Sequence, residues 1–326
     1  MTASVAAVVT GCAGFIGSHL VEALLGDGAR VYGVDKLDDY YAPALKIRNV
    51  EAALRHPRFS LHVVDLADAS ATAAFAASIP KPEVVVHLAA VAGVRLSVSD
   101  PSRYVKANLV ATQNVLDAWS RTARVPLVFA SSSSVYGNKS RAPFSEDEPC
   151  IDPPSPYAAT KRGGELLCQV AHQIHNCPIT MLRFFTVYGP RQRPDLAIRK
   201  FSTAILRREE VTMFDDGSMA RDFTHVSDIV RGIRSAMGET SGLQVLNLGN
   251  SSPCTVRVLI EKLGAALGIE PRVRRAPRPA GEMDVTFADI RRAWERWGWR
   301  PEVTLDDGLR DFAGWIKAEE QAHQNP

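Results

Sequence analysis

The sequence predicts an α/β protein that combines a doubly wound parallel sheet with a smaller mixed α/β domain for substrate. Short runs of valine, leucine and alanine, such as residues 5–10 and 84–88, are typical of strands buried on both faces. Segments with helical spacing of apolar residues separate these runs, so strands and helices alternate. After about residue 190, prolines, arginines and short strands replace the alternation, which indicates a second domain.

Each element expected from these patterns has a place along the chain. The first five strands are expected at residues 5–10, 31–34, 61–64, 84–88 and 127–130, with helices at 18–25 and 104–119. Later strands at 212–214 and 245–248 mix with helices at 197–207 and 255–267. We therefore expect a dinucleotide-binding domain at residues 1–190, to which about 220–250 return, and a substrate domain at 191–326.

Composition and charge argue against several classes of function. The 326-residue chain has a net charge of +2, from 38 basic and 36 acidic residues, so neither nucleic acid nor a membrane is an expected partner. Its five cysteines lack disulfide or metal spacing, which favours a reducing, cytoplasmic compartment and no metal. We also expect no membrane span and no signal peptide, because the apolar runs are short and the first residues lack a basic segment.

A glycine pattern follows the first expected strand. Residues 10–18 read TGCAGFIGS, which places Gly11, Gly14 and Gly17 between a strand and a helix. In dinucleotide-binding turns such glycines allow a tight turn, a close approach of the pyrophosphate and close helix–strand packing. The pattern therefore predicts a Rossmann-type site, with phosphates at the helix N-terminus. A glycine loop of purely structural use is the alternative interpretation.

Acidic residues end the next two expected strands. Asp35 stands 18 residues after Gly17, where a carboxylate binds the adenine-ribose hydroxyls and repels a 2′-phosphate. This position predicts NAD rather than NADP, and the adjacent Lys36 argues weakly in the opposite direction. Asp65 ends the third strand, where it could bind adenine or serve as the N-cap of the next helix.

A tyrosine and a lysine stand one helical turn apart in SPYAATKRGGE. Tyr157 and Lys161 share a helix face, and the ammonium favours the phenolate of a side chain that otherwise titrates near ~10. A phenolate beside an oxidised nicotinamide is what oxidation of an alcohol by hydride transfer requires. The serines at 131–134 follow the fifth strand, where a hydroxyl can bridge the phenol and the substrate oxygen. The alternative is a surface pair on an amphipathic helix.

At these residues the sequence resembles the extended short-chain dehydrogenases/reductases, in the group of nucleotide-sugar epimerases and dehydratases. The resemblance covers essentially the whole chain, through TGCAGFIGSHL, HLAAVAGVR, SSSSVYGN, YAATK, LRFFTVYGPRQRPDLA, ARDFTHVSDI and RPAGEMDVTFAD. It is closest to the bacterial UDP-glucuronate 4-epimerases and next to the UDP-galactose 4-epimerases.

The resemblance implies roles for the matching residues. Tyr157 is implied to be the base, Lys161 its activator and nicotinamide-ribose ligand, and Ser132 the assisting hydroxyl. The implied NAD contacts are Gly11, Gly14, Phe15, Ile16, Gly17, Asp35, Lys36, Asp65, Leu66, Leu88, Ala89, Ala90, Tyr157, Lys161, Phe185 and Val187. The implied UDP-sugar contacts are Arg95, Ser132, Ser133, Ser134, Tyr157, Thr186, Arg191, Arg193, Arg221 and Glu282. Thr186 and Glu282 replace the asparagine and aspartate that are more usual there.

The residues after Ser132 distinguish between reactions in this group. The resemblance implies that dehydratases carry an acidic pair at the next two positions and that decarboxylases carry a glutamate at the second. This chain has Ser133 and Ser134 instead, so elimination has no obvious acid or base. The remaining reaction is return of the hydride to the opposite face of a 4-keto sugar, which inverts C4.

A 4-keto uronate loses carbon dioxide when its carboxylate aligns with the carbonyl, so an epimerase for such a substrate must hold the carboxylate out of alignment. The serine hydroxyls and an arginine suit this task, because a guanidinium pairs with a carboxylate through two parallel bonds. We expect Arg193 to bind the carboxylate, with Arg191 as the second choice, and either arginine could be neutralised by Asp195.

The sequence therefore predicts an NAD-dependent UDP-sugar 4-epimerase that acts on UDP-glucuronate and UDP-galacturonate. The alternatives are a UDP-glucose/UDP-galactose 4-epimerase, a UDP-glucuronate decarboxylase and, in a different class, a non-catalytic NAD-sensing regulator. The resemblance also implies a homodimer through the exposed apolar faces of helices at 104–119 and 163–174.

Overall fold

The computed structural model describes residues 5–121, 123–138, 140–277 and 284–324. The chain forms two compact units. The first contains Met1–Ser140, Glu146–Phe184 and Val230–Asn247, and the second contains Arg141–Ser145, Phe185–Ile229 and Leu248–Pro326.

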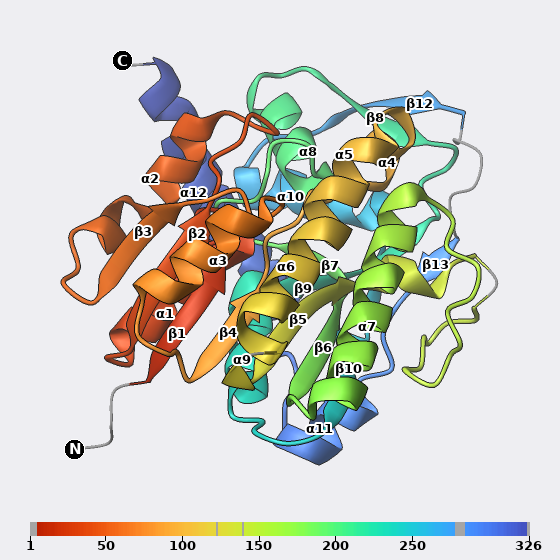
Figure 1. Ribbon diagram of the computed structural model, residues 1–326. Helices are drawn as coiled ribbons and strands as arrows, with labels where there is room; N and C mark the ends of the chain where they lie inside the picture. Colours follow the sequence, from red (N-terminus) through yellow and green to blue (C-terminus); the bar gives the residue numbers. More distant parts are fainter. Residues whose placement is uncertain (1–4, 122, 139, 278–283, 325–326) are drawn as a thin grey trace. The chain divides into compact units, whose positions relative to one another are not determined.

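A seven-stranded sheet forms the centre of the first unit (Figure 1). Its strands are β1 (Ala6–Thr10), β2 (Arg30–Asp35), β3 (Phe59–Val63), β4 (Val84–His87), β5 (Leu127–Ser132), β6 (Ile179–Phe184) and β10 (Leu243–Leu248), in the order β10-β6-β5-β4-β1-β2-β3. The strands from β3 to β6 pair in parallel. The strand order reverses between β1 and β4, and open parallel sheets bind ligands at the carboxyl ends of strands at such a point. The predicted α/β class is confirmed.

Helices connect these strands. They are α1 (Phe15–Gly26), α2 (Pro43–Leu54), α3 (Ala69–Ser78), α4 (Val94–Ser99), α5 (Pro101–Tyr104), α6 (Ala111–Val115), α7 (Pro156–His175) and α9 (Val226–Met237), which continues from the second unit into the first. The helix expected at 104–119 is interrupted by π-helical segments at Val105–Val110 and Leu116–Arg121. Apolar spacing does not distinguish these wider turns from an α-helix.

The main core of the first unit lies between the sheet and the helices α3, α6 and α7. Val8 and Val85 from the sheet, Phe75 from α3, Trp119 from the second π-helical segment and Cys168 from α7 are all buried there. The central strands β1 and β4 are buried at every residue except Ala6, which explains why their sequences are continuous apolar runs instead of alternating ones.

The second unit has smaller sheets. Its strands are β7 (Thr186–Tyr188), β8 (Glu210–Phe214), β9 (Ala220–His225), β11 (Pro253–Thr255), β12 (Arg272–Ala276) and β13 (Val285–Thr286). Its helices are α8 (Ala197–Leu206), α10 (Val256–Leu267), α11 (Arg291–Trp297) and α12 (Leu305–Gln324). The strand β9 pairs with β7 and β13 in parallel and with β11 antiparallel, while β8 pairs with β12. Tyr188, Leu259 and Phe312 are buried in its core.

Two differences from the predicted strand ends affect the site. The fifth strand was expected at residues 127–130, but β5 continues through Ser131 to Ser132, because both serines pair with β6. The third strand ends at Val63, so Asp65 lies beyond its end. The side chains of a strand alternate between faces, and the longer β5 therefore sends Ser131 and Ser132 to opposite sides.

Candidate active site

The glycine turn joins β1 to α1 so tightly that side chains are excluded. Gly11 has φ +68°, and a Cβ there would lie 2.8 Å from the backbone nitrogen of Ala89. A Cβ at Gly17 would collide with the carbonyl oxygen of Gly11. Gly14 is the N-cap of α1 and has no side chain to satisfy the first amides of the helix. This turn fits a dinucleotide pyrophosphate, because it places the first amides of α1 without a side-chain cap at the helix N-terminus.

Asp35 connects the glycine turn to the loop after β2. Its carboxylate accepts hydrogen bonds from the amides of Ala13 at 3.2 Å and Leu37 at 2.9 Å. Burial raises the pKa of this carboxyl, and the two amides and the charge of Lys46 partly oppose that effect. Each carboxylate oxygen retains a lone pair for a ribose hydroxyl. The position of Asp35 at the end of β2 therefore fits the adenine ribose of NAD.

The segment after β4 lies against the same turn. The amide of Ala89 donates to Thr10 Oγ1 at 3.1 Å, and that oxygen also contacts His87 Nδ1 at 2.8 Å. Ala89 and the carbonyl carbon of Leu88 thus lie beside Gly11, and the resemblance implied cofactor contacts at Leu88, Ala89 and Ala90.

Asp65 does not serve as a helix cap. The N-cap of α3 is Asp68, whose carboxylate accepts from the amide of Ala71 at 2.9 Å, so the alternative role considered for Asp65 is wrong. Asp65 accepts from the amide of Ala67 at 3.0 Å, in a turn just beyond β3. Leu66 is buried in the core, and only its backbone carbonyl makes polar contacts that the structure describes, with Thr72 and Asn114. Binding of adenine by Asp65 and Leu66 stays a prediction.

The predicted tyrosine and lysine lie at the start of α7. The helix begins at Pro156 after its N-cap Ser155, whose hydroxyl accepts from the amide of Ala158. Lys161 is buried, and its Nζ donates to the carbonyl of Ala130 at 2.7 Å. Burial lowers the pKa of Lys161 to about 8. The ammonium is therefore held at one position on β5, one helical turn from Tyr157.

Tyr157 is half-buried, and an aromatic neighbour supports its ring. Tyr104 at the end of α5 meets that ring edge to face, with 6.1 Å between the centroids and 76° between the planes. Thr160 Oγ1 donates to the carbonyl of Tyr157 and accepts a hydrogen bond from the side-chain Nδ2 of Asn108. Tyr104 and Asn108 are both buried, and our reading of the sequence assigned neither of them to the site. In the sequence, Tyr104 and Asn108 stand out only as polar side chains within the apolar spacing of the helix expected at 104–119.

The serines after β5 take different roles. Ser131 donates to the buried carboxylate of Glu165 at 2.6 Å. Ser132 Oγ accepts from the amide of Ser134 at 3.2 Å and from its hydroxyl at 2.9 Å. Because Ser132 is the acceptor in both bonds, its own proton remains to be donated to a substrate oxygen. Ser133 and Ser134 lie in the 3₁₀ turn Ser133–Tyr136, against which α7 packs.

Most of the other predicted sugar contacts lie in the second unit. Thr186 and Val187 are in β7, directly after Phe185, and Arg221 is in β9, where its Nη1 donates to the carbonyl of Ala220. Arg95 is in the first unit, exposed on α4. Glu282 lies outside the described residues.

The structure shows the local surroundings of the two arginines that were predicted to bind a substrate carboxylate. Arg193 pairs with Asp195 through two parallel bonds, at 3.0 Å from Nε and 2.8 Å from Nη2. Asp195 therefore neutralises Arg193, as considered from the sequence. Arg191 has φ +64°, a left-handed conformation that is uncommon for a residue with a side chain.

Two general features complete the description. The described residues contain no group of three or more histidine, cysteine, aspartate or glutamate side chains that could hold a metal ion. Among those same residues, no helix is both long and apolar enough to cross a membrane.

Comparison with known proteins identifies the family. The model of the NAD dependent epimerase/dehydratase family matches residues 7–249. The UDP-glucuronate 4-epimerase of Thermodesulfobacterium geofontis is 37% identical over 95% of both chains. The crystal structure of UDP-glucuronic acid 4-epimerase from Bacillus cereus, with UDP-glucuronic acid and NAD, has a TM-score of 0.89 at 37% identity and covers 96% of this chain and 99% of that chain.

A structure solved with a different UDP-sugar is also similar to that of this chain. The structure of UDP-glucose 4-epimerase from Thermotoga maritima with UDP-glucose has a TM-score of 0.88 at 30% identity, covering 97% of this chain and 99% of that one. The predicted fold and the NAD cofactor are confirmed by these matches together with the sheet order. The chain belongs to the NAD dependent epimerase/dehydratase family.

Proposed function

We propose that this protein is an NAD-dependent 4-epimerase that interconverts UDP-glucuronate and UDP-galacturonate. The observation that carries the proposal is the pairing of Tyr157 with a buried, anchored Lys161 beside serines that bring no carboxylate. The relatives at 37% identity that are named UDP-glucuronate 4-epimerases confirm the activity predicted from the sequence.

The residues of the first unit can perform the proton transfers of this reaction. Tyr157 takes the proton of the sugar 4-hydroxyl, and Ser132 donates a hydrogen bond to the same oxygen. Lys161 stabilises the phenolate by its charge, because Ala130 holds the ammonium within one turn of the phenol. NAD held by the glycine turn and Asp35 would supply the acceptor for the C4 hydride and the donor that returns it to the opposite face. Tyr157 then gives the proton back to O4, so neither protons nor electrons are consumed overall.

The serine turn favours return of the hydride over elimination. Ser134 Oγ bonds to Ser132 Oγ, so a hydroxyl occupies the position at which a carboxylate would start elimination. The nearby carboxylate of Glu165 is already engaged by Ser131 and by Arg183, with which it forms a buried ion pair. These bonds keep the Glu165 carboxylate from acting as an acid or a base in the reaction.

The C6 carboxylate of the substrate is assigned to Arg193, with Arg191 as second choice. The pairing with Asp195 keeps the Arg193 guanidinium ordered before substrate binds. Because the two parallel bonds of Arg193 go to Asp195, a substrate carboxylate would have to share this guanidinium with Asp195 or displace Asp195 from it.

The proposed assembly is a homodimer in the cytoplasm. Leu166, Val170 and Ile174 are 47%, 49% and 69% exposed along one face of α7, and exposed valines of α4 and the first π-helical segment belong to neighbouring helices. A second copy that covers these side chains would form a four-helix contact. The five cysteines are all free, which supports a reducing compartment.

The substrate is tested by incubating the purified protein with UDP-glucuronate and with UDP-glucose and following the products by NMR. We expect UDP-galacturonate from the first and little conversion of the second. Conversion confined to neutral sugars would replace the proposal with the activity of the Thermotoga maritima relative. Release of a UDP-pentose and carbon dioxide would identify a decarboxylase.

A further inference from the structure

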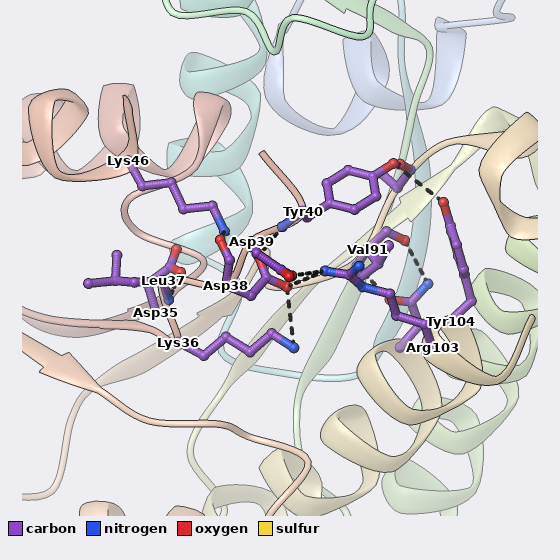
Figure 2. Close-up of polar contacts among 12 residues, drawn as sticks. Asp35, Lys36, Leu37, Asp38, Asp39, Tyr40, Lys46, Val91, Arg103 and Tyr104 are labelled. Carbon is purple, nitrogen blue, oxygen red and sulfur yellow. Dashed lines mark hydrogen bonds and ion pairs between the residues drawn. The ribbon is translucent and has the colours of Figure 1, made fainter. Parts of the chain in front are cut away.

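A cluster of three cations surrounds one carboxylate in the loop after Asp35 (Figure 2). The carboxylate of Asp38 pairs with Lys36 at 3.3 Å, with Arg103 at 3.4 Å and, in a shorter contact, with Lys46. The cations come from the end of β2, from α5 and from α2 respectively. Asp38 is thus the shared counter-ion of three cations from three separate elements. These charges lie close in the sequence or in space to Asp35, the residue expected to bind the ribose.

The three cations are not equally held. Lys46 is 7% exposed, also donates to the Asp38 carbonyl at 2.9 Å, and lies over the ring of Tyr41. Arg103 pairs with Asp39 at 2.9 Å as well and lies over the ring of Tyr40. Lys36 is 34% exposed, and Asp38 is the partner that the structure describes for its ammonium. Lys36 is therefore the cation that a change at Asp38 would release most directly.

Lys36 stands where its charge would matter for the choice of dinucleotide. It directly follows Asp35, whose carboxylate fits the adenine-ribose hydroxyls and would repel a 2′-phosphate. A lysine beside that ribose would attract a 2′-phosphate in the same place. The acidic and the basic residue are adjacent in the sequence and favour opposite dinucleotides, so the outcome depends on what neutralises the lysine.

Asp38 is suited to this neutralising role. Burial acts to raise its pKa, but the hydrogen bond and charge of Lys46 and then the charge of Lys36 lower it to about 2. The carboxylate is therefore ionised at any pH at which the protein would be assayed. Figure 2 shows Lys36 extending along the loop toward Asp38, with the dashed contact between them.

We propose that Asp38 is a residue that determines the preference for NAD over NADP, because its ion pair with Lys36 keeps that lysine from binding a ribose 2′-phosphate. The inference rests on the NAD dependence of the proposed function, but not on the identity of the sugar.

The test measures the affinity of protein freed of nucleotide for NADH and NADPH, by the change in nicotinamide fluorescence on titration without any UDP-sugar. Asp38→Asn is expected to increase the affinity for NADPH relative to NADH about tenfold. The gain should shrink in 0.5 M salt, because it is electrostatic. Adding Lys36→Gln to Asp38→Asn should return the ratio to within twofold of wild type.

Asp39→Asn is the matched control. It removes the same charge one residue along, but Asp39 is 88% exposed and pairs with Arg103 instead of Lys36, so the ratio should stay within twofold of wild type. Lys36→Gln alone provides a test that does not need the Asp38 variant to fold, and it too should leave the ratio within twofold.

Three results would overturn the inference. These are an unchanged ratio in folded Asp38→Asn, an equal gain in Asp39→Asn, and a gain that survives the double substitution. A fivefold or larger loss of NADPH affinity in Lys36→Gln alone would also overturn it, because the lysine would then already be available to a 2′-phosphate. Absence of epimerase activity on any sugar would affect only the proposed function.

Discussion

The ring of Tyr104 stands edge-on to the ring of Tyr157, 6.1 Å away between centroids. The hydroxyl of Tyr104 lies 3.4 Å from that of Tyr40, which donates to the carbonyl of Ala92. The proposed base, Tyr157, is thus supported by a buried aromatic residue from another helix. Residues of the loops after β2 and β4 contact that aromatic residue or its partner. Such support matters because a base displaced by about 1 Å can lose ~100-fold in rate.

Substitutions at Tyr104 should separate the ring from the hydroxyl. Tyr104→Phe keeps the edge-to-face contact and is expected to retain kcat within about twofold of wild type. Tyr104→Leu removes the contact and should lower kcat about tenfold or more, with KM for the sugar within about twofold, because the base rather than the binding surface is disturbed. Steady-state kinetics with thermal melts measure both. Equal kcat values in the two folded variants would contradict a positioning role.

Tyr157→Phe should abolish turnover and leave the cofactor in place. Loss of a general base costs typically ~10²–10⁴-fold in rate, while the glycine turn and Asp35 are untouched. The kcat for UDP-glucuronate and the affinity for NADH, measured on the same preparation, give the comparison. A variant that turns over at the wild-type rate would show that another group takes the proton. A wild-type protein that binds NADH but turns over no UDP-sugar would instead favour the non-catalytic NAD-sensing regulator.

The buried Lys161 should impose a pH dependence on stability. Its pKa is about 8 in the folded protein against an ordinary 10.5, so between these values the unfolded chain binds more protons and the free energy of unfolding rises with pH. The full rise would be roughly 3 kcal/mol. Denaturant unfolding of cofactor-free protein at pH 7.5 and at pH 10 measures this rise in the free energy of unfolding. We expect no such rise in Lys161→Met. The exposed Lys106→Met is the control, and a slope in Lys161→Met like that of wild type would exclude this origin.

The ion pair of Glu165 with Arg183 should be costly to break from one side. The two side chains are 1% and 3% exposed, and the Nε–Oε1 distance is 2.8 Å. Glu165→Gln leaves a buried guanidinium without its counter-ion and is expected to cost about 3–5 kcal/mol of unfolding free energy. The exposed pair of Glu51 with Arg55 offers the control, since Glu51→Gln should cost less than ~0.5 kcal/mol. Similar losses for both variants in urea titrations would argue against burial as the cause.

A charge on the apolar face of α7 should separate the proposed dimer. Val170 is 49% exposed in the middle of this face, and Val170→Glu is expected to elute as a monomer where the wild type elutes as a dimer. Ile151→Glu changes an apolar residue that is 83% exposed but lies before the helix, and it should remain dimeric. Light scattering after size-exclusion chromatography gives the masses. A monomeric wild type would remove the dimer from the proposal.

Local patterns were sufficient for the fold class and for the elements that carry part of the candidate site. The strand–turn–helix at Gly11–Gly17, the acidic end of β2 and the Tyr157–Lys161 spacing each depend on residues that are near in sequence, and the structure places them on the elements expected. The ends of elements were predicted less well. The serine run looked like a loop because serine is common in turns, yet pairing with β6 extends β5 through Ser132.

The sequence by itself determined the alternation of strands and helices in the first unit, the glycine turn and the chemical groups available for hydride chemistry, because these follow from periodicity and from spacing within a single turn or strand. Only the tertiary structure decided which distant side chains act together. The ring of Tyr104 comes to Tyr157 from 53 positions earlier, and Arg103 reaches Asp38 across 65. Such contacts form where separate βα units meet along a parallel sheet, and no local pattern encodes which of several polar side chains will meet there.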